Sequence, residues 1–217
     1  MAAELLENFL PGRPGWQFMW ILLIILVFAV AIAIERAIYI FVKSNINAPK
    51  FMTEIRKLVK AGDYDKALNL CERAKDRALP KVVSCGLRKV ADSESVDFRS
   101  IQNSVDEGML EVIPRLQERT SFLAMIGNVA TLIGLMGTIY GLILSFKSVS
   151  AAGIDSAEKA RLLAAGISTA MNTTFLGLFV AIPTILLYTF IHNKTTKIID
   201  EIDEHTVKLI NLITGSQ

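Results

Sequence analysis

Three long apolar stretches constrain the fold of this chain more than any other feature. They cover residues 17–34, 120–146 and 162–191, and the second and third contain no charged residue. A helix needs about 20 residues to cross the hydrocarbon core of a bilayer, so each stretch is long enough to span it. Apolar residues make up 52% of the 217 residues and are concentrated in these blocks. This distribution is typical of a membrane protein.

The pattern predicts an all-α integral membrane protein with three transmembrane helices and a helical cytoplasmic domain. The run after Arg13 has the length of a signal peptide, but no small-residue cleavage site follows it, and Trp16 and Trp20 suit interface anchors. We therefore expect a retained first helix. The predicted divisions are the outside N-terminus with the first span (1–42), a cytoplasmic helical domain (43–119), the second span (120–147), a short outside loop (148–161), the third span (162–192) and a cytoplasmic C-terminal helix (193–217).

Basic residues set the expected orientation, because Lys and Arg are in excess on the cytoplasmic side of membrane proteins. The outside positions are Arg13, Lys147, Lys159 and Arg161, the last three offset by Asp155 and Glu158. More basic residues lie on the other side of the membrane, after the first span, before the second or after the third: Lys43, Lys50, Arg56, Lys57, Arg115, Arg119, Lys194 and Lys197. The N-terminus is therefore expected outside and the C-terminus in the cytoplasm.

The charged segment after the first span has helical periodicity. Pro49 can begin a helix, and the sequence Ala61-Gly62-Asp63 predicts a stop followed by an N-cap, so the segment indicates a helical hairpin. A further helix is expected from about Asp97 into the second span, as one rod with a kink at Pro114.

The sequence lacks the motifs of several function classes. It has no phosphate-binding glycine loop, no pair of histidines on one helical face and no nucleophile elbow, so we expect neither an enzyme nor a cofactor. Cys71 and Cys85 lack metal-ligand spacing and are expected as reduced thiols, and His192 and His205 as solvated side chains; no metal site is predicted. Mixed charges, with a net charge of +2, argue against nucleic-acid binding.

Polar and small residues form a regular pattern on the second span. Asn128, Thr131, Thr138 and Ser145 are spaced by three and seven, which places them on one side of a helix. Gly127, Gly134 and Gly141 recur every seventh residue and, with Gly137, leave a surface that a neighbouring helix can approach closely.

The third span clusters hydroxyls within two turns and then carries Gly177 and Pro183. At about 1.5 Å per residue, its Thr174 and the Thr138 of the second span lie at compatible depths for one site. One hypothesis is that such hydroxyls only bond backbone carbonyls and hold helices together, at about 0.6 kcal/mol per contact. The other is an ion path, with these candidates: Thr131, Thr138, Thr169, Asn172, Thr173 and Thr174.

Two membrane motifs resemble those of a known family. "LIGLMGTIYGLILSF" (132–146) and "TTFLGLFVAIPTILLY" (173–188) are similar to the second-span and third-span motifs of the MotA/TolQ/ExbB proton-channel family, in its three-span TolQ/ExbB branch. The resemblance extends to Glu35-Arg36 and to "AGDYDKALNLC" (61–71), and so covers nearly the whole chain.

The resemblance implies an energy transducer of the bacterial inner membrane, with its loop 148–161 in the periplasm. Such subunits form pentamers around two single-span ExbD/TolR-type partners, each with a membrane aspartate, and ion flow is converted to work on the cell envelope through a further envelope protein. By motif, Thr138 and Thr174 correspond to the pore threonines. Thr169 stands where many TolQ and ExbB members have a glutamate, a departure from the pattern.

Glu35 and Arg36 end the first span, where we expect both to reach water. Interfacial ion pairing or a subunit contact is favoured for Glu35 over ion conduction, although a membrane carboxylate is often functional. The function hypothesis is an ion-conducting stator subunit, with protons favoured and sodium as the alternative. A non-conducting membrane scaffold is the alternative function. A neighbouring gene for a single-span protein with a membrane aspartate would separate the two.

Overall fold

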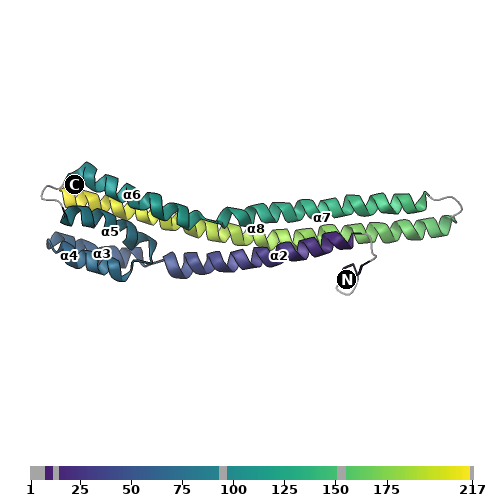
Figure 1. Ribbon diagram of the computed structural model, residues 1–217, viewed down its shortest axis with the longest axis horizontal. Helices are drawn as coiled ribbons and strands as arrows, with labels where there is room; N and C mark the ends of the chain where they lie inside the picture. Colours follow the sequence, from purple (N-terminus) through teal and green to yellow (C-terminus); the bar gives the residue numbers. More distant parts are fainter. Residues whose placement is uncertain (1–7, 12–14, 93–96, 151–154, 216–217) are drawn as a thin grey trace. The chain divides into compact units, whose positions relative to one another are not determined.

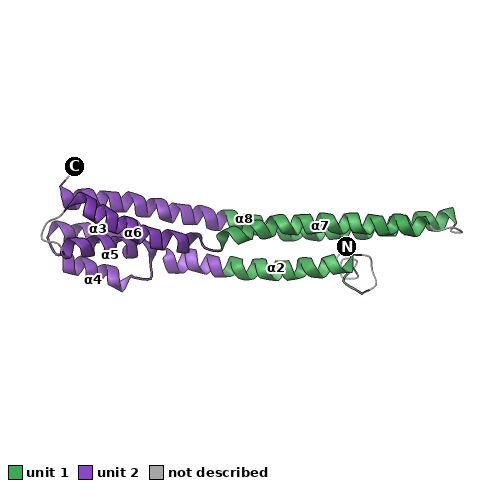
Figure 2. Cartoon of the chain, turned by 45° about the horizontal axis from the view of Figure 1, so that its top comes forward, with its two compact units in different colours: residues 1–34, 119–189 green, residues 35–118, 190–217 purple. Residues whose placement is uncertain are grey.

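The computed structural model describes residues 8–11, 15–92, 97–150 and 155–215. Every regular element in these ranges is a helix, as the all-α prediction requires (Figure 1). The chain divides into two compact units (Figure 2): unit 1 within residues 1–34 and 119–189, and unit 2 within residues 35–118 and 190–217. The predicted N-terminus (1–7 and 12–14, with Arg13), loop residues 151–154 and the last two residues lie outside the described residues.

The three predicted spans all lie on long helices. The first is in α2 (Trp16–Ala37), the second in α7 (Thr120–Val149) and the third in α8 (Ser156–Thr214). All three helices are long and apolar enough to cross a membrane. Helix α8 continues without interruption from the third span through the predicted C-terminal helix.

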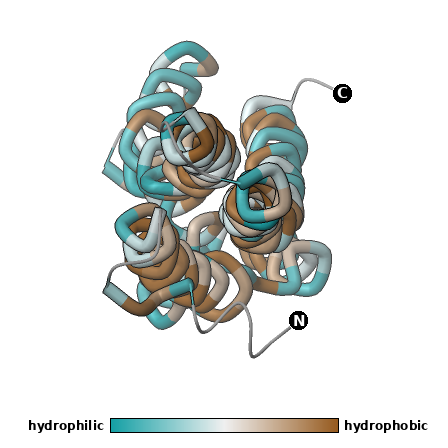
Figure 3. Tube along the Cα trace, turned by 90° about the vertical axis from the view of Figure 1, so that its right-hand side faces the viewer, coloured by the Kyte–Doolittle hydropathy of each residue, from teal (hydrophilic) through white to brown (hydrophobic). Residues whose placement is uncertain are grey.

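Many large apolar side chains on the three long helices of unit 1 are exposed. Figure 3 colours the Cα trace by the hydropathy of each residue. Examples are Val27 at 63% exposure, Leu132 at 63% and Phe179 at 58%. Water-soluble monomers rarely expose so many large apolar side chains together. These faces therefore suit lipid or neighbouring membrane helices.

The core of unit 1 is a small apolar contact among three helices. Leu22 of α2, Ala130 of α7, and Val180 and Ala181 of α8 are almost completely buried together. Partly buried aliphatic side chains surround them: Ile25, Leu26, Ile133 and Leu176. The alanines keep α7 and α8 close, since small residues let membrane helices approach.

Unit 2 contains the predicted helical hairpin, formed by α3 (Ala48–Lys60) and α4 (Tyr64–Arg73). Asn47 caps α3 by accepting a hydrogen bond from the Lys50 amide at 3.2 Å. Gly62 has φ +75°, which favours glycine at the turn. Asp63 precedes α4 as expected, but its carboxylate makes no capping bond and pairs with Lys66 Nζ at 2.8 Å.

A further helix, α5 (Ala78–Ala91), packs against α4 and against α6 (Phe98–Gln117). The sequence analysis did not predict α5. Its contact with α6 depends on glycines in both helices. A Cβ on Gly86 would lie 2.7 Å from Val105 Cγ2, and a Cβ on Gly108 would lie 3.0 Å from Cys85 Sγ. Cys71 and Cys85 are free thiols, as expected.

The expected continuous rod from Asp97 into the second span is interrupted. Helix α6 ends at Gln117, Arg119 adopts a left-handed conformation (φ 58°), and α7 begins at Thr120. Pro114 lies inside α6, and the break comes after it rather than as a kink at the proline itself. Since proline lacks an amide hydrogen, Pro114 cannot donate to the carbonyl of Leu110 in the preceding turn, whereas its own carbonyl accepts a hydrogen bond from the Glu118 amide at 2.8 Å.

Arg36 does not reach water, contrary to expectation. It is 3% exposed, and its guanidinium donates to the carbonyls of Leu116 and Arg115, the latter at 3.3 Å. The guanidinium carbon also lies 4.9 Å from the centre of the Tyr39 ring, in the π-helical segment η1 (Ile38–Ser44). The last carbonyls of a helix lack intrahelical partners and carry partial negative charge, so an arginine there is stabilising. Glu35 is exposed.

Candidate ion pathway

The hydroxyls of the third span lie beside the backbone of the second. Thr174 Oγ1 donates to the Gly134 carbonyl at 3.2 Å. Thr173 Oγ1 lies 3.4 Å from the same carbonyl and 2.7 Å from the Ala170 carbonyl of its own helix. Thr173 is 1% exposed, whereas Thr174 is half-buried. The structure therefore brings the third-span cluster to Gly134, one turn of α7 before Thr138.

The other hydroxyl candidates bond only their own helices. Thr138 Oγ1 donates to the Leu135 carbonyl at 2.6 Å, and Thr131 Oγ1 to the Gly127 carbonyl at 3.1 Å. Thr169 is buried and donates to the Ala165 carbonyl at 3.0 Å. Bonds of this kind to carbonyls three or four residues earlier are common for Ser and Thr in helices. Asn172 is half-buried on α8.

Gly134 and Gly177 lie where the backbones of α7 and α8 approach one another closely. A Cβ on Gly134 would lie 3.1 Å from Gly177 Cα, and a Cβ on Gly177 would lie 2.9 Å from both Gly134 Cα and the Ala130 carbonyl oxygen. These neighbours are backbone atoms, which cannot move aside as a flexible side chain can. The hydrogen bond from Thr174 reaches Gly134 because no side chain separates the two backbones.

The remaining packing candidates extend this contact along the two helices. A Cβ on Gly127 would lie 2.6 Å from Ile185 Cγ1, one on Gly137 2.7 Å from Thr173 Oγ1, and one on Gly141 3.1 Å from Ala170 Cβ. All four candidate glycines of α7 are buried. Pro183 lies inside α8.

Sequence reasoning missed a contact near the other end of these helices. A Cβ on Gly166 would lie 1.5 Å from Ser145 Oγ, so Gly166 makes room for a buried serine. Ser145 in turn donates to the Gly141 carbonyl at 2.8 Å. The signal was present, since Ser145 belongs to the polar stripe of the second span, but its partner on the third span could not be identified from spacing alone.

The polar groups of this contact carry no formal charge. No Asp, Glu, Lys or Arg occurs at 120–146 or 162–191. Within the described residues, no three His, Cys, Asp or Glu side chains gather as a metal site. The arrangement offers hydroxyl and carbonyl oxygens, which can contact a cation or an acid proton but cannot themselves take up and release a proton near neutral pH.

Comparisons with known proteins agree with this architecture. Residues 74–204 match the profile of the MotA/TolQ/ExbB proton channel family. The chain is 31% identical over 100 residues to the biopolymer transport protein ExbB of Aquifex aeolicus, a match that covers 46% of this chain and 64% of that protein. It is 32% identical over 158 residues to the putative biopolymer transport protein ExbB-like 3 of Synechocystis, covering 73% and 72% of the two chains.

A solved structure shares the fold. The structure of C. jejuni MotAB includes a chain that matches with a TM-score of 0.62 and 20% identity, over 87% of this chain and 70% of that one. The match to the Aquifex protein covers just under two thirds of that protein's own length. The family profile matches more than half of the residues of this chain, and the chain therefore belongs to the MotA/TolQ/ExbB proton channel family.

Proposed function

We propose that this protein is the ion-conducting stator subunit of an energy-transducing complex in the bacterial inner membrane. The observation that carries the proposal is the hydroxyl cluster of Thr173 and Thr174 at the close crossing of two uncharged spans. A wall of this kind supplies polar contacts along a path but lacks a titrating group. That group has to come from another chain.

The donor hydrogens of the two pore candidates are already engaged. Thr138 donates to the Leu135 carbonyl and Thr174 to the Gly134 carbonyl. A hydroxyl has one hydrogen to donate and two lone pairs, so both side chains keep lone pairs that can accept. They suit a hydronium ion, a sodium ion or the acid proton of a neutral carboxyl group better than a bare carboxylate. Protons are the favoured ion, with sodium as the alternative.

The proposed complex contains five copies of this chain around two single-span partners of the ExbD/TolR type. Each partner would carry one aspartate in the membrane. Desolvation raises the pKa of such a carboxyl and favours its protonated form, which can then donate to the threonine oxygens of each subunit in turn. Ion flow would drive relative motion of the subunits and partner helices. The work would reach the cell envelope through a further envelope protein. The N-terminus would face the periplasm and the C-terminus the cytoplasm.

The decisive experiment measures ion flux in proteoliposomes. The chain is co-expressed with a single-span protein of the ExbD/TolR type from the same organism, and the purified complex is reconstituted with an imposed pH or sodium gradient. We expect flux that requires both chains and disappears when the partner's membrane aspartate is changed to asparagine. Flux in the absence of sodium would identify protons as the ion. A complex that assembles fully but conducts neither ion would overturn the proposal.

One observation favours the second candidate, a non-conducting scaffold. The hydroxyls of Thr131, Thr138 and Thr169 all bond carbonyls of their own helices, as they would if they served only to satisfy backbone groups. A scaffold would still pack through its glycines and still assemble with partners. It would show no flux, and loss of its hydroxyls would leave its cellular function intact.

A further inference from the structure

Unit 2 contains a cleft of about 980 Å³ that the proposed ion path does not use. Its walls come from η1, from α4 and the residues that follow it, and from α5 and α6. Its volume falls within the range of sites that hold one small molecule or head group, which is about 300–1,000 Å³.

Positive charge dominates the lining of this cleft. Seven lysine or arginine side chains line it, against three carboxylates. Polar side chains without charge also contribute, among them Tyr39, Asn69 and the buried Ser44. A concave surface with one dominant sign of charge concentrates ions of the opposite sign.

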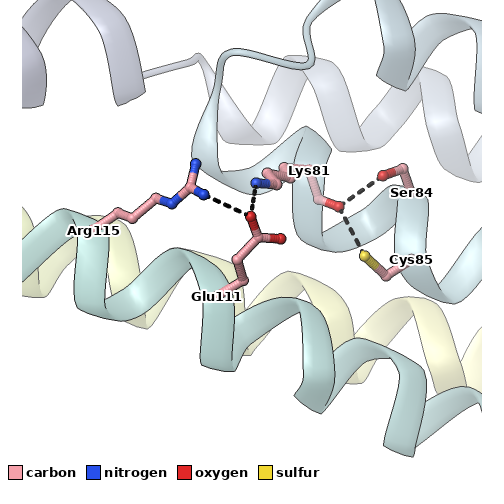
Figure 4. Close-up of polar contacts among 5 residues, drawn as sticks. All are labelled: Lys81, Ser84, Cys85, Glu111 and Arg115. Carbon is pink, nitrogen blue, oxygen red and sulfur yellow. Dashed lines mark hydrogen bonds and ion pairs between the residues drawn. The ribbon is translucent and has the colours of Figure 1, made fainter.

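Two of the cations are held in place by one carboxylate. Glu111 Oε1 lies 2.6 Å from Lys81 Nζ and 3.0 Å from an Arg115 guanidinium nitrogen (Figure 4). The hydrogen bond from Lys81, together with the nearby positive charge of Lys81, lowers the pKa of Glu111. The three side chains keep a net positive charge, and the shared carboxylate fixes two donors from α5 and α6 at the cleft wall.

Three other cations of the cleft have no carboxylate partner in the described part of the chain, and a fourth has only a distant one. Among the described residues, Lys43, Arg73 and Lys75 take part in no ion pair, and the Arg88 guanidinium is 3.9 Å from the nearest Glu72 oxygen. Concentrated cations repel one another, so an anion in the cleft would relieve that repulsion. An anion with several acceptor oxygens could also use the Lys, Arg, Ser and Tyr donors together.

We propose that this cleft binds a phosphate-bearing anion. A phosphate group carries one or two negative charges and several strong acceptor oxygens, which matches a mixed set of Lys, Arg and hydroxyl donors. Two sources share this chemistry: the head group of an anionic phospholipid and a soluble phosphorylated compound. Lys43 lies shortly after the apolar run of α2, and Arg115 shortly before α7, so the lining is close in the chain to two spans. This proximity makes the lipid source the favoured one.

The test uses the full-length protein and two probes. The first is phosphatidylglycerol, incorporated into phosphatidylcholine nanodiscs, with native mass spectrometry of the retained lipid. The second is pyrophosphate, added to protein in detergent, with a thermal-shift titration. The Lys43→Gln/Lys75→Gln double variant removes two unpaired charges from the cleft. The matched control is Lys50→Gln/Lys60→Gln, which removes two exposed lysines of the same unit that do not line it.

Whichever of the two probes binds the parent protein, we expect the Lys43→Gln/Lys75→Gln variant to bind it about 10- to 30-fold more weakly, because each lysine contributes about fivefold to the affinity. The control variant should bind that probe nearly as tightly as the parent does. Retention of phosphatidylglycerol without a pyrophosphate shift supports the lipid source, and a saturable pyrophosphate shift supports the soluble source. Equal weakening in both double variants would reduce the effect to general charge and overturn the site. Binding of neither probe, as when a second copy of the chain fills the cleft, would also overturn it.

Discussion

Thr174 of α8 donates its hydroxyl hydrogen to the backbone carbonyl of Gly134 on α7, 3.2 Å away. The two helices are close enough for this bond because Gly134 and Gly177 face one another without side chains. One residue thus joins the two features of these spans, the hydroxyls and the glycines. Substitutions can therefore test separately whether the glycines serve assembly and whether the hydroxyls serve the proposed ion flow.

Replacing Thr174 by valine should abolish most of the ion flux but leave the complex assembled. Valine keeps the shape of threonine, and an interhelical hydrogen bond in a membrane contributes only about 0.6 kcal/mol to stability. If the hydroxyl lowers the barrier to ion passage by about 1.4 kcal/mol, its loss slows flux about tenfold. Proteoliposome flux with the partner present measures this. Thr174→Ser, which keeps the hydroxyl, is the control and should retain most of the flux; parent-like flux in Thr174→Val would contradict the pore role.

Enlarging Gly134 should have the opposite pattern, with assembly lost first. A methyl group at Gly134 would lie 3.1 Å from Gly177 Cα and 3.2 Å from the Thr173 carbonyl oxygen, so α7 and α8 would have to separate slightly. We expect Gly134→Ala to destabilise the protein by about 1–3 kcal/mol and Gly134→Leu to prevent assembly. Size-exclusion chromatography and thermal unfolding measure both. Leu132→Met, at an exposed position of the same helix, is the control; a full-size complex in Gly134→Leu would refute the packing role.

Removing the Arg36 side chain should destabilise unit 2. The guanidinium is buried and serves the carbonyls of Arg115 and Leu116 at the end of α6. Hydrogen bonds to a charged group contribute about 1.5–3 kcal/mol, so Arg36→Ala should lower the free energy of unfolding by about that amount. Arg36→Lys should recover only part of it, because lysine lacks the planar set of donors. Thermal unfolding of both variants tests the prediction, and an unchanged midpoint in Arg36→Ala would exclude this role.

The sequence predicted the spans and their polar pattern well, because both depend on local composition and period. Positions such as Gly134 and Thr174 could be identified from spacing, but their direct contact could not, since it depends on how two distant helices pack. Helix α5 was not predicted, although Leu79, Val83 and Leu87 recur at helical spacing in it; its contacts with α4 and α6, which bury these residues, could not be identified from the sequence. The burial of Arg36 was missed for a related reason: its partners are the carbonyls of a distant helix end.

The two cysteines should differ sharply in reactivity. Burial, with a smaller effect of Glu72, raises the pKa of the Cys71 thiol to about 12, so at pH 8 only about one part in ten thousand is the reactive thiolate. Burial also raises the pKa of Cys85, but this side chain is only partly buried. In detergent, a maleimide should therefore modify Cys71→Ser protein, which keeps Cys85, well before it modifies Cys85→Ser protein.

Added denaturant provides the control, since both single-cysteine proteins should then react equally fast. Faster labelling of Cys71 than of Cys85 in the folded protein would contradict the burial of Cys71. In whole cells, an impermeant reagent should modify neither thiol before lysis if unit 2 is cytoplasmic. Labelling of intact cells would reverse the proposed orientation.

Stability should fall on mild acidification because of His205. Burial lowers the pKa of this imidazole, and the positive charge of Arg56 on α3 adds to the effect, as does Lys208, while Glu204 and Glu201 oppose it. Within the described residues its Nδ1 is buried without a hydrogen-bond partner. With a folded-state pKa below the unfolded value near 6.5, the unfolded chain takes up the proton first as pH falls. The contribution of His205 is therefore complete above pH 6.5 and is lost as pH falls through the lower, folded-state pKa. Asp203 has the opposite effect on stability, at pH values nearer its ordinary pKa of 3.8, since burial and the nearby Asp200 and Asp106 raise the pKa of its carboxyl group.

Thermal unfolding at pH 7.5 and at about pH 5.5 measures the histidine effect. The His205→Gln protein should lose less stability between these two conditions than the parent. An identical drop in the parent and His205→Gln proteins would show that other groups cause the acid sensitivity.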